Sequence, residues 1–375
     1  MALQQLKYWE WRILMVKVKN EFHPDYAVPP GEILEYELEF RAMSQKELSD
    51  RTGITSKHLI SIIRGDSAIT PQTAIKLERV LGMPVDYWLN LESQYREILA
   101  RKSEKKQLER DLEWLKRVPV NEMAKRGWIE KPKDKMAVLD RVLKFFGIAS
   151  VAQWDDIWPN LAVAYRQHQK HEVFPEAVSA WLRKGELESH KIQCNKFDKS
   201  GFKALLSDLR ALTTKTPKNF VPELQQRCAN FGVAVVFVPA LPKTSVSGAT
   251  RWLTKDKALI QLSLRYKSND HLWFTFFHEA GHILLHGKKE MFLEGTNGLD
   301  GKKEEEADKF AEEMLIPRAE FNAFVKARNF YADDIRGFAE AIGIAPGIVV
   351  GQLQHKKFLP QNFCNELKQR YEWEG

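Results

Sequence analysis

The sequence predicts a multidomain protein with an all-helical N-terminal domain, a helical linker region and a C-terminal domain of the α+β class. Three observations support this prediction. The chain has 375 residues, which is more than one ordinary core accommodates and suggests two or three domains. Its 44% hydrophobic and 11% aromatic residues suffice to bury such cores. Runs of β-type residues occur only in the C-terminal half, among segments with helical periodicity.

Charge and cysteine content restrict the class of protein. The formal net charge of +7 favours a polyanionic partner, although an ordinary soluble protein can carry the same charge. Cys194, Cys228 and Cys364 are widely spaced and odd in number, so we expect neither a disulfide framework nor a thiolate zinc site. No stretch approaches the ~20 apolar residues of a membrane span, and the apolar run at 13–16 is shorter than a signal-peptide core. The sequence therefore predicts a cytoplasmic protein with no membrane partner.

The N-terminal segment, residues 1–27, is interpreted as an extension to which no function is assigned. Either Met1 or Met15 can be the true start, because the residues from Met15 onward are more ordinary in polarity. The Pro-Pro-Gly sequence at 29–31 interrupts the chain before a helical series that extends to about Leu91.

Two short helices joined by a glycine turn are predicted within the sequence MSQKELSDRTGITSKHLISIIRG. Ser44 and Thr55 are the predicted N-caps, and Gly53 provides the turn. The apolar face that packs the two helices together comes from Leu48, Ile54, Leu59, Ile62 and Ile63. These proportions are typical of a helix-turn-helix, although a plain helical hairpin with a solvated polar face has the same pattern.

The side chains that would contact DNA follow from these helix positions. On the second helix, the outward-facing residues that can reach base edges are Ser56, Lys57, His58 and Ser61. Gln45 and Thr55 lie at the two helix N-termini, where backbone N–H groups and the helix dipole favour phosphate. These two residues would position the protein on DNA rather than select a base sequence.

Residues 30–97 resemble the lambda-repressor-like (XRE) domains of HigA-type antitoxins. The similarity extends from PGEIL through SQKELSDRTGITSKHLISIIRG to VDYWLNLESQYRE. It implies a five-helix domain over residues 28–97 that binds palindromic, double-stranded operator DNA as a homodimer. It also implies that Tyr87, Trp88 and Leu89 of the closing helix belong to the core rather than to a ligand site.

Residues 98–196 are predicted to form a helical connector. Charges of alternating sign over 93–117 indicate a solvated helix, and amphipathic segments follow at 136–146 and 175–188. The remaining residues, 197–375, form the predicted C-terminal domain.

Two β-type runs distinguish this C-terminal domain, one at 233–239 and one at 258–264. A later segment, 333–355, has helix-turn-helix spacing around Gly343. Its second helix offers small and apolar side chains where base-reading groups are needed, so we expect it to pack against the rest of the domain.

The sequence His278-Glu279-Ala-Gly-His282 is an HExxH motif. On a helix, residues i and i+4 share a face, so His278 and His282 can both direct an imidazole nitrogen toward a zinc ion. Glu279 can then lie beside the metal-bound water as a general base. A buried helix with two hydrogen-bonded histidines is the alternative, but the preceding apolar run and the acidic amphipathic segment 304–317 favour a metal site.

A catalytic zinc needs a third protein ligand and one open position. Glu304 is the predicted third ligand, and Asp308, one turn later, is predicted to orient a ligand histidine. Glu305 and Glu306 face other directions and are predicted to be exposed to solvent. His286 is the rival ligand, but a straight helix cannot easily bring three turns of histidines around one ion.

HEAGHILLH followed by EEEADKFAEEMLIP resembles the ImmA/IrrE family of metallopeptidases, which is related to the gluzincins. The likeness covers roughly residues 197–359. It implies a gluzincin-like α+β fold, with His278, His282 and Glu304 as Zn²⁺ ligands and Glu279 as the general base. Asp308 occupies a position where the family often has Asn or Asp.

The gluzincin resemblance has a further implication for the strand that precedes the HExxH helix. That strand, predicted at 258–264, would lie at the edge of the cleft and pair with an extended substrate. Arg265 and Tyr266 at its end can stabilise an oxyanion or serve a structural role, and the structural role is favoured for both.

The two resemblances together imply a DNA-binding, antitoxin-like transcriptional regulator. Its C-terminal domain would be a zinc-dependent endopeptidase that cleaves a regulatory protein partner such as a repressor or toxin. The alternative is a non-catalytic antitoxin or repressor in which the zinc domain is a sensor or partner-binding module. Glu279 favours the first hypothesis, because a purely structural zinc site needs no general base.

Overall fold

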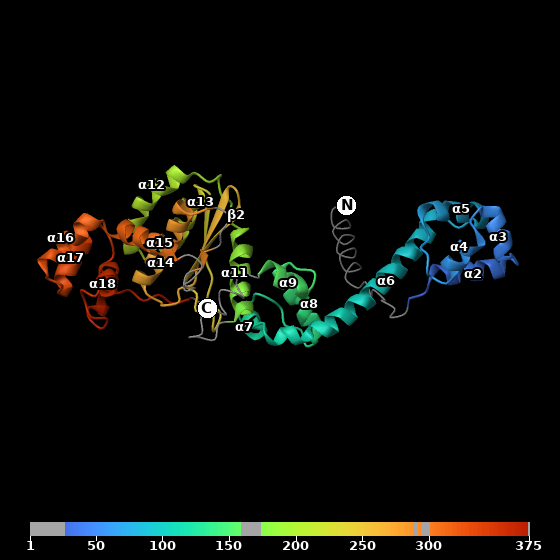
Figure 1. Cartoon of the computed structure of the whole chain (residues 1–375), viewed down its shortest axis with the longest axis horizontal. Helices are drawn as coiled ribbons and strands as arrows, with labels where there is room; N and C mark the ends of the chain where they lie inside the picture. Colours follow the sequence, from blue (N-terminus) through green and yellow to red (C-terminus); the bar gives the residue numbers. More distant parts are fainter. Residues whose placement is uncertain (1–26, 159–173, 288–291, 294–300, 374–375) are drawn as a thin grey trace, which may run out of the picture. The chain divides into compact units, whose positions relative to one another are not determined.

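The computed structural model of this chain describes residues 27–158, 174–287, 292–293 and 301–373. The chain divides between Arg110 and Asp111 into two units, each with its own internal packing. Helices form the described part of the N-terminal unit, whereas the C-terminal unit combines helices with a small sheet (Figure 1). The predicted multidomain architecture of all-α and α+β parts is therefore confirmed. The predicted N-terminal extension falls outside the described residues except for Ala27.

Five helices make up the described N-terminal unit, and local signals set their ends. The Ser44 side chain accepts a hydrogen bond from the Glu47 backbone N–H at 3.1 Å, and Thr55 accepts one from His58 at 3.3 Å. Gly53 between the two helices has a φ of 65°, as the predicted turn requires. The helices are α2 (Pro30–Phe40), α3 (Gln45–Thr52), α4 (Ser56–Ile63), α5 (Pro71–Leu81) and α6 (Val85–Asp111).

The core of the N-terminal unit contains the predicted apolar face. Its buried residues are Leu34, Leu38, Leu48, Ile54, Leu59, Ile62, Ile69, Ala74, Leu77, Leu81 and Trp88, and Ile63 and Leu89 pack against them. Tyr87 was expected in the core, and this was wrong: the residue is 39% exposed, with its ring packed edge to face against that of Trp88. Buried Glu92 accepts hydrogen bonds from Ile69 N–H and from Arg96, and the bond to Ile69 fixes α6 to the segment just before α5.

The middle of the chain is helical, as predicted, but its first helix is not separate. The segment 93–117 continues α6 without a break to Asp111 and then tightens into a 3₁₀ helix. The domain boundaries at 97 and 196 remain predictions. The described elements that follow α6 are η1 (Leu112–Lys116), α7 (Val120–Lys125), α8 (Lys135–Phe146), α9 (Val151–Ile157) and α11 (Pro175–Ser189).

The rest of the C-terminal unit surrounds a four-stranded sheet. Its helices are α12 (Lys199–Leu209), η2 (Arg210–Thr214), α13 (Pro217–Ala229), α14 (Asn269–Leu285), α15 (Gly301–Leu315), α16 (Arg318–Ala327), α17 (Ala332–Ile342), α18 (Pro346–His355) and η3 (Asn365–Leu367). Its strands are β1 (Val233–Phe237), β2 (Gly248–Thr254), β3 (Lys257–Leu262) and β4 (Phe292–Leu293).

The strand order β1-β3-β2-β4 corrects one prediction. β3 pairs in parallel with β1 and antiparallel with β2, so the strand before the HExxH helix lies inside the sheet. Its backbone groups face two partner strands, which leaves neither side available to an extended substrate. The expectation that this strand lies at the cleft edge was therefore wrong.

Alternate residues of β3 face different helices, because side chains along a strand point to opposite faces. Ile260 and Leu262 belong to the core cluster that includes the apolar residues of α14. Gln261, between them, donates a hydrogen bond to the Trp181 backbone carbonyl of α11 at 2.7 Å. The sheet thus lies between α11 on one face and α14 on the other (Figure 1).

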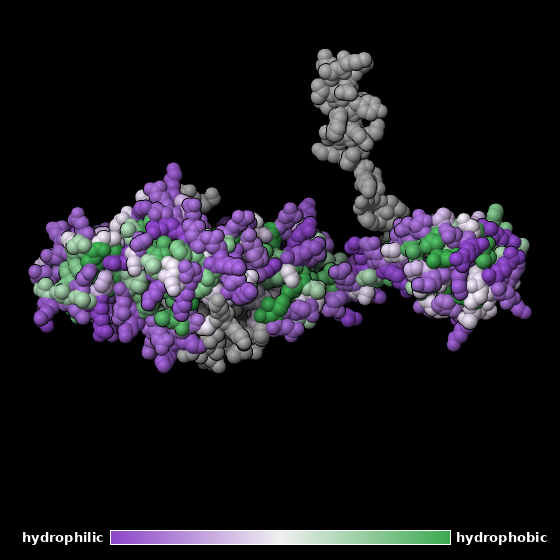
Figure 2. Space-filling model, turned by 90° about the horizontal axis from the view of Figure 1, so that it is seen from above, coloured by the Kyte–Doolittle hydropathy of each residue, from purple (hydrophilic) through white to green (hydrophobic). Residues whose placement is uncertain are grey.

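The visible surface of each unit is predominantly hydrophilic (Figure 2). This is expected when apolar side chains gather in separate cores within the units. Among the described residues, no helix has the length and apolar character needed to cross a membrane.

Candidate metal centre and DNA-binding helices

The HExxH motif lies on α14, which is buried along nearly its whole length. Its side chains pack against the sheet on one side and against α15 and α18 on the others. A helix that is apolar around most of its circumference is stable in such an interior position. Thr250 of β2 donates a hydrogen bond to the Glu279 carbonyl at 3.1 Å, which fixes the middle of α14 to the sheet.

Small residues let α15 approach α14 closely at the level of the motif. A Cβ atom at Gly281 would lie 3.1 Å from Phe310 Cδ1 and 3.3 Å from Ala307 Cα, so a larger residue would push the helices apart. Ala307 is fully buried at this contact. The close contact brings the acidic side chains of α15 within reach of the histidines of α14.

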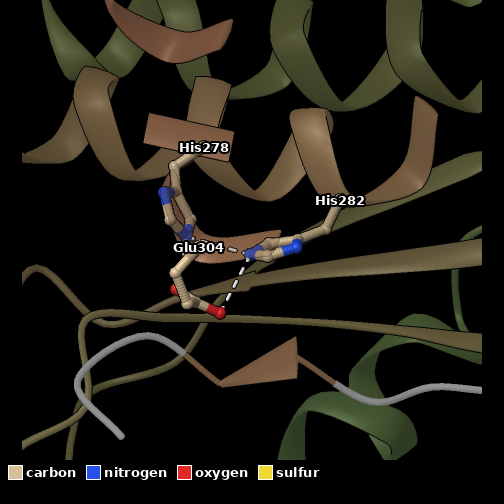
Figure 3. A group of neighbouring side chains, drawn as sticks. All are labelled: His278, His282 and Glu304. Atoms are coloured by element: carbon tan, nitrogen blue, oxygen red, sulfur yellow. Dashed lines mark hydrogen bonds and ion pairs between the residues drawn. The ribbon is translucent and has the colours of Figure 1, made fainter. Parts of the chain in front are cut away.

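Three side chains point toward one another between these two helices (Figure 3). The Nε2 atoms of His278 and His282 lie 3.0 Å apart. Glu304 of α15 approaches with one oxygen 3.2 Å from His278 Nε2 and the other 3.5 Å from His282 Nε2. One potential ligand atom from each residue lies within 4.8 Å of the others.

This donor set fits a zinc ion. In a tetrahedral site with zinc–ligand distances of about 2.0–2.1 Å, neighbouring ligand atoms are roughly 3.3–3.4 Å apart, close to the spacing seen here. Burial, reinforced by His278, His286 and Lys303, lowers the pKa of His282 to about 2. His282 is therefore neutral at physiological pH, and neutral imidazole is the form that binds metal.

The Nδ1 atoms of both histidines also have partners. His278 Nδ1 lies 2.8 Å from Asp308 Oδ1, one turn after Glu304 on α15. His282 Nδ1 lies 2.9 Å from His286 Nδ1, on the side of the ring away from Glu304. Of the two carboxylates predicted to be exposed, Glu306 also contacts His286.

Glu279, the predicted general base, is completely buried. It directly follows His278 and lies on the side of α14 that faces β2, where Gly248 leaves room for its side chain. Thr275, which lies one helical turn before Glu279 on α14, also borders Gly248. The carboxylate is therefore held between α14 and β2, on the residue that directly follows the first of the three converging side chains.

A cavity of about 250 Å³ begins one helical turn from His278. The ring of Phe274, which borders it, lies 6.1 Å from the His278 ring. The lining combines polar or ionisable side chains with aromatic and apolar ones, and consists of Tyr266, Asp270, His271, Phe274, Glu312, Leu315, Ile348, Gly351, Gln352 and His355.

Two other predicted features are the residues at the end of β3, Arg265 and Tyr266, and the helix-turn-helix spacing at 333–355. Arg265 donates to the Ser245 carbonyl and lies over the Tyr266 ring, which stacks on His271. The helix-turn-helix spacing at 333–355 corresponds to α17 and α18, joined through Gly343 with a φ of 73°. The small and apolar residues at the start of α18 are buried, which confirms the expectation that this segment packs against the domain.

The predicted DNA-contacting residues lie on and around α3 and α4. Ser56 and Lys57 are exposed in the first turn of α4, and His58 follows them partly buried. Gln45 is the first residue of α3 and is partly buried. Thr55 is exposed, but its hydroxyl caps α4.

Ser61 differs from the other predicted contact residues. Its hydroxyl lies 2.7 Å from the Ser67 hydroxyl, and its carbonyl accepts bonds from the backbone of Asp66 and Ser67. Its side chain therefore holds the turn after α4 and is less available to a base than that of Lys57.

Several residues that shape the site were not found from the sequence. Gly248, Thr250 and Gly281 position Glu279 and α15, but no local pattern marks a glycine as a point of close approach. The strand β2, with the sequence GATRWLT, was not predicted, because its small residues come first and its large residues follow, without the alternation of apolar and polar side chains that marks a strand.

Comparisons with known proteins agree with the two halves of this description. Residues 39–88 match the helix-turn-helix family model, and residues 228–350 match the model of the IrrE N-terminal-like domain, Peptidase_M78. An uncharacterized HTH-type transcriptional regulator, YddM of Escherichia coli (strain K12), is 32% identical over 66 residues, which is 18% of this chain and 70% of that protein.

Similar solved structures include an antidote protein and an antitoxin. An addiction module antidote protein of a HigA family from Coxiella burnetii has 34% identity over 23% of this chain and 94% of its own, with a TM-score of 0.21. Pseudomonas aeruginosa antitoxin HigA with the higBA promoter has 29% identity over 23% of this chain and 95% of its own, with a TM-score of 0.22. Through its N-terminal unit the chain belongs to the helix-turn-helix family of transcriptional regulators, and its C-terminal unit carries an IrrE N-terminal-like domain of the Peptidase_M78 type.

Proposed function

We propose that the C-terminal unit is a zinc-dependent endopeptidase and that the N-terminal unit binds double-stranded operator DNA. The protein would then be a transcriptional regulator that cleaves a regulatory protein such as a repressor or toxin. The observation that carries the enzymatic part is the convergence of His278, His282 and Glu304, with buried Glu279 directly after His278 on the same helix.

The ligand set favours a catalytic site over a structural one. His278, His282 and Glu304 would hold the ion, and among the described residues they form the group of potential ligands at this place. Structural zinc sites have four protein ligands, whereas catalytic sites have three and one open position. Three ligands thus leave a position for water or substrate.

The chemistry then divides between the ion and the chain. Bound zinc lowers the pKa of water toward about 7 and polarises a peptide carbonyl. Glu279 accepts a proton from the attacking water and delivers it to the leaving amine. Asp308 holds the His278 ring through Nδ1, which directs Nε2 toward the ligand group. The nearby cavity, with Phe274 in its wall, would take a substrate side chain.

The DNA-binding part is supported by the helix-turn-helix match and by the surface of α4. Ser56 and Lys57 are exposed in its first turn, where recognition helices contact base edges. A palindromic operator bound by a homodimer would follow from the geometry common to such domains.

Glu279→Gln tests the enzymatic proposal, because this change keeps the size of the side chain and removes its basicity. Zinc content, thermal unfolding and operator binding of the variant should equal those of the parent. Cleavage of the partner protein, followed by mass spectrometry of the products, should fall by about 10²–10⁴-fold.

The comparison of Glu279→Gln with the parent needs a control variant that cannot bind the metal. His282→Ala should lose stoichiometric zinc together with activity. Equal cleavage by the parent and by zinc-loaded Glu279→Gln would contradict the peptidase mechanism. The alternative, a DNA-binding repressor with a non-catalytic zinc module, would then be the better account.

A further inference from the structure

His286 follows the last residue of α14, and its side chain lies against the predicted ligand His282. It is the C-cap residue, with extended backbone angles of φ −112° and ψ 172°, so the helix stops there. Its backbone N–H donates to the His282 carbonyl at 3.1 Å, and its side chain is only 3% exposed. The imidazole is therefore a buried group held against one specific neighbour.

The contact between the two imidazoles lies on the side of His282 away from the ligand group. His286 Nδ1 lies 2.9 Å from His282 Nδ1, whereas His282 Nε2 faces His278 at 3.0 Å. An imidazole cannot direct both nitrogens at one ion. His286 therefore approaches the back of the His282 ring, and it does not complete the ligand group around Nε2.

If His282 binds the metal through Nε2, the positions of the ring protons on His282 and His286 follow. A histidine that binds metal through Nε2 carries its proton on Nδ1, so His282 donates to His286 Nδ1. A neutral His286 that accepts at Nδ1 carries its own proton on Nε2. That nitrogen lies 3.3 Å from Glu306 Oε2 on α15, and a carboxylate is an acceptor.

The arrangement parallels the one at the other histidine. His278 Nδ1 reaches the Asp308 carboxylate directly, at 2.8 Å. His282 reaches the Glu306 carboxylate through one intervening imidazole. Both carboxylates come from α15, the helix that carries Glu304.

We propose that His286 and Glu306 form a positioning pair that fixes the tautomer and ring orientation of His282 and thereby sets the zinc affinity of the site. The proposal rests on the proposed zinc site, and neither residue is assigned a step in the chemistry. Loss of an outer hydrogen-bond partner of a ligand histidine typically costs 10–100-fold in metal affinity.

Zinc affinity, measured by competition with a chromophoric chelator, tests the pair without any substrate. His286→Phe fills the buried space and removes both hydrogen bonds, so its zinc affinity should fall by about 10–100-fold. His286→Gln keeps an acceptor and a donor and should recover part of the loss. Glu306→Gln should weaken binding less, because its side chain is 47% exposed. The matched control is Glu305→Gln on the adjacent, outward-facing position, with unchanged affinity.

A double-mutant cycle separates a specific pair from general damage to the fold. If Glu306 acts through His286, the effect of Glu306→Gln disappears in the His286→Phe background. Electronic spectra of the cobalt-substituted proteins should keep the same number of nitrogen ligands. Because Glu306 is on the surface, its variant reports on the pair even if His286→Phe unfolds.

Several results would overturn the positioning role. Parental zinc affinity in both Glu306→Gln and a folded His286→Phe would show that the contact has no consequence for the metal. Additive effects in the cycle would show that the residues act independently, and loss of a nitrogen ligand from the cobalt spectrum would make His286 a direct ligand. A parent protein that binds no zinc, or a His282→Ala variant with parental affinity, would instead contradict the proposed metal site itself.

Discussion

Gly248→Ala should displace the proposed general base without touching a proposed zinc ligand. Gly248 begins β2 opposite Leu262 and faces α14. An added Cβ would lie 2.5 Å from Thr275 Cγ2, 2.7 Å from Glu279 Oε1 and 3.0 Å from Glu279 Cγ. Carbon atoms in normal contact are ~3.5–4.0 Å apart. The Glu279 side chain must therefore move by roughly 1 Å, since β2 is held in the sheet on one side and α14 is packed on the other.

The size of the effect follows from that displacement. A misplacement of about 1 Å at a catalytic group costs on the order of 10²-fold in rate, equivalent to ~2.7 kcal/mol of transition-state stabilisation. The crowding itself should lower the free energy of unfolding by about 1–3 kcal/mol. Zinc content should stay at the parental value, because the three atoms nearest to the added methyl group belong to Thr275 and Glu279 and not to a proposed ligand.

The assay combines kcat/KM for the partner protein with zinc per chain and thermal unfolding. Gly337→Ala is the matched control, because a Cβ there meets nothing within 4 Å and the residue lies in the exposed middle of α17. That variant should keep parental activity and gain ~0.5–1 kcal/mol of stability from the better helix propensity of alanine.

Two outcomes would refute this reasoning. If Gly248→Ala is folded, holds zinc and keeps kcat/KM within a few-fold of the parent, the position of Glu279 does not matter to the reaction. If the variant loses zinc, moving the Glu279 side chain also disturbs the zinc ligands, and the two effects cannot be separated by this substitution.

Two further predictions concern DNA binding and alkaline stability. Lys57→Ala in the full-length protein should weaken operator binding by about 1–3 kcal/mol if the side chain contacts a base and less if it contacts phosphate, with Lys218→Ala as the charge-matched control. An unchanged affinity and an unchanged salt dependence in a footprinting titration would remove Lys57 from the interface. Burial raises the pKa of Tyr371 to about 12 from its usual value near 10, so the unfolded chain releases this proton first and stability should fall by ~2–3 kcal/mol between pH 10 and 12. In chemical unfolding experiments, the stability of Tyr371→Phe should not show this loss. An identical pH dependence in parent and variant would show that folding does not raise the pKa of Tyr371.

The features predicted well from the sequence depend on residues that are close in the chain. Ser44 and Thr55 cap helices through hydrogen bonds to residues three positions later. His278 and His282 share a face because they are one turn apart, whichever way the helix packs. Glu304 is far from the histidines in the chain; it was predicted as the third ligand from an acidic segment and a family resemblance, and the structure brings it within 3.5 Å of both histidines. Its role as a zinc ligand stays a prediction.

The features predicted wrongly or not at all depend on distant segments. β3 was expected at an edge because of the gluzincin resemblance, and nothing in its own residues reveals that β2 pairs along its second side. Tyr87 was assigned to the core because of the resemblance to HigA-type domains, yet its helix turns it outward while Trp88 faces inward. His286 could be weighed from the sequence only as a ligand or not a ligand.

By itself, therefore, the sequence determined the helices and their caps, the separation of an all-helical from a mixed α+β part, and the chemical types available for a metal site. The tertiary structure alone decided which strand is interior, how closely α14 and α15 approach at Gly281, and which side of His282 each neighbour occupies. The physical reason is the range of the interactions. Caps and helical faces satisfy hydrogen bonds and burial within a few residues, whereas strand pairing and helix contacts depend on which distant surfaces exclude water together.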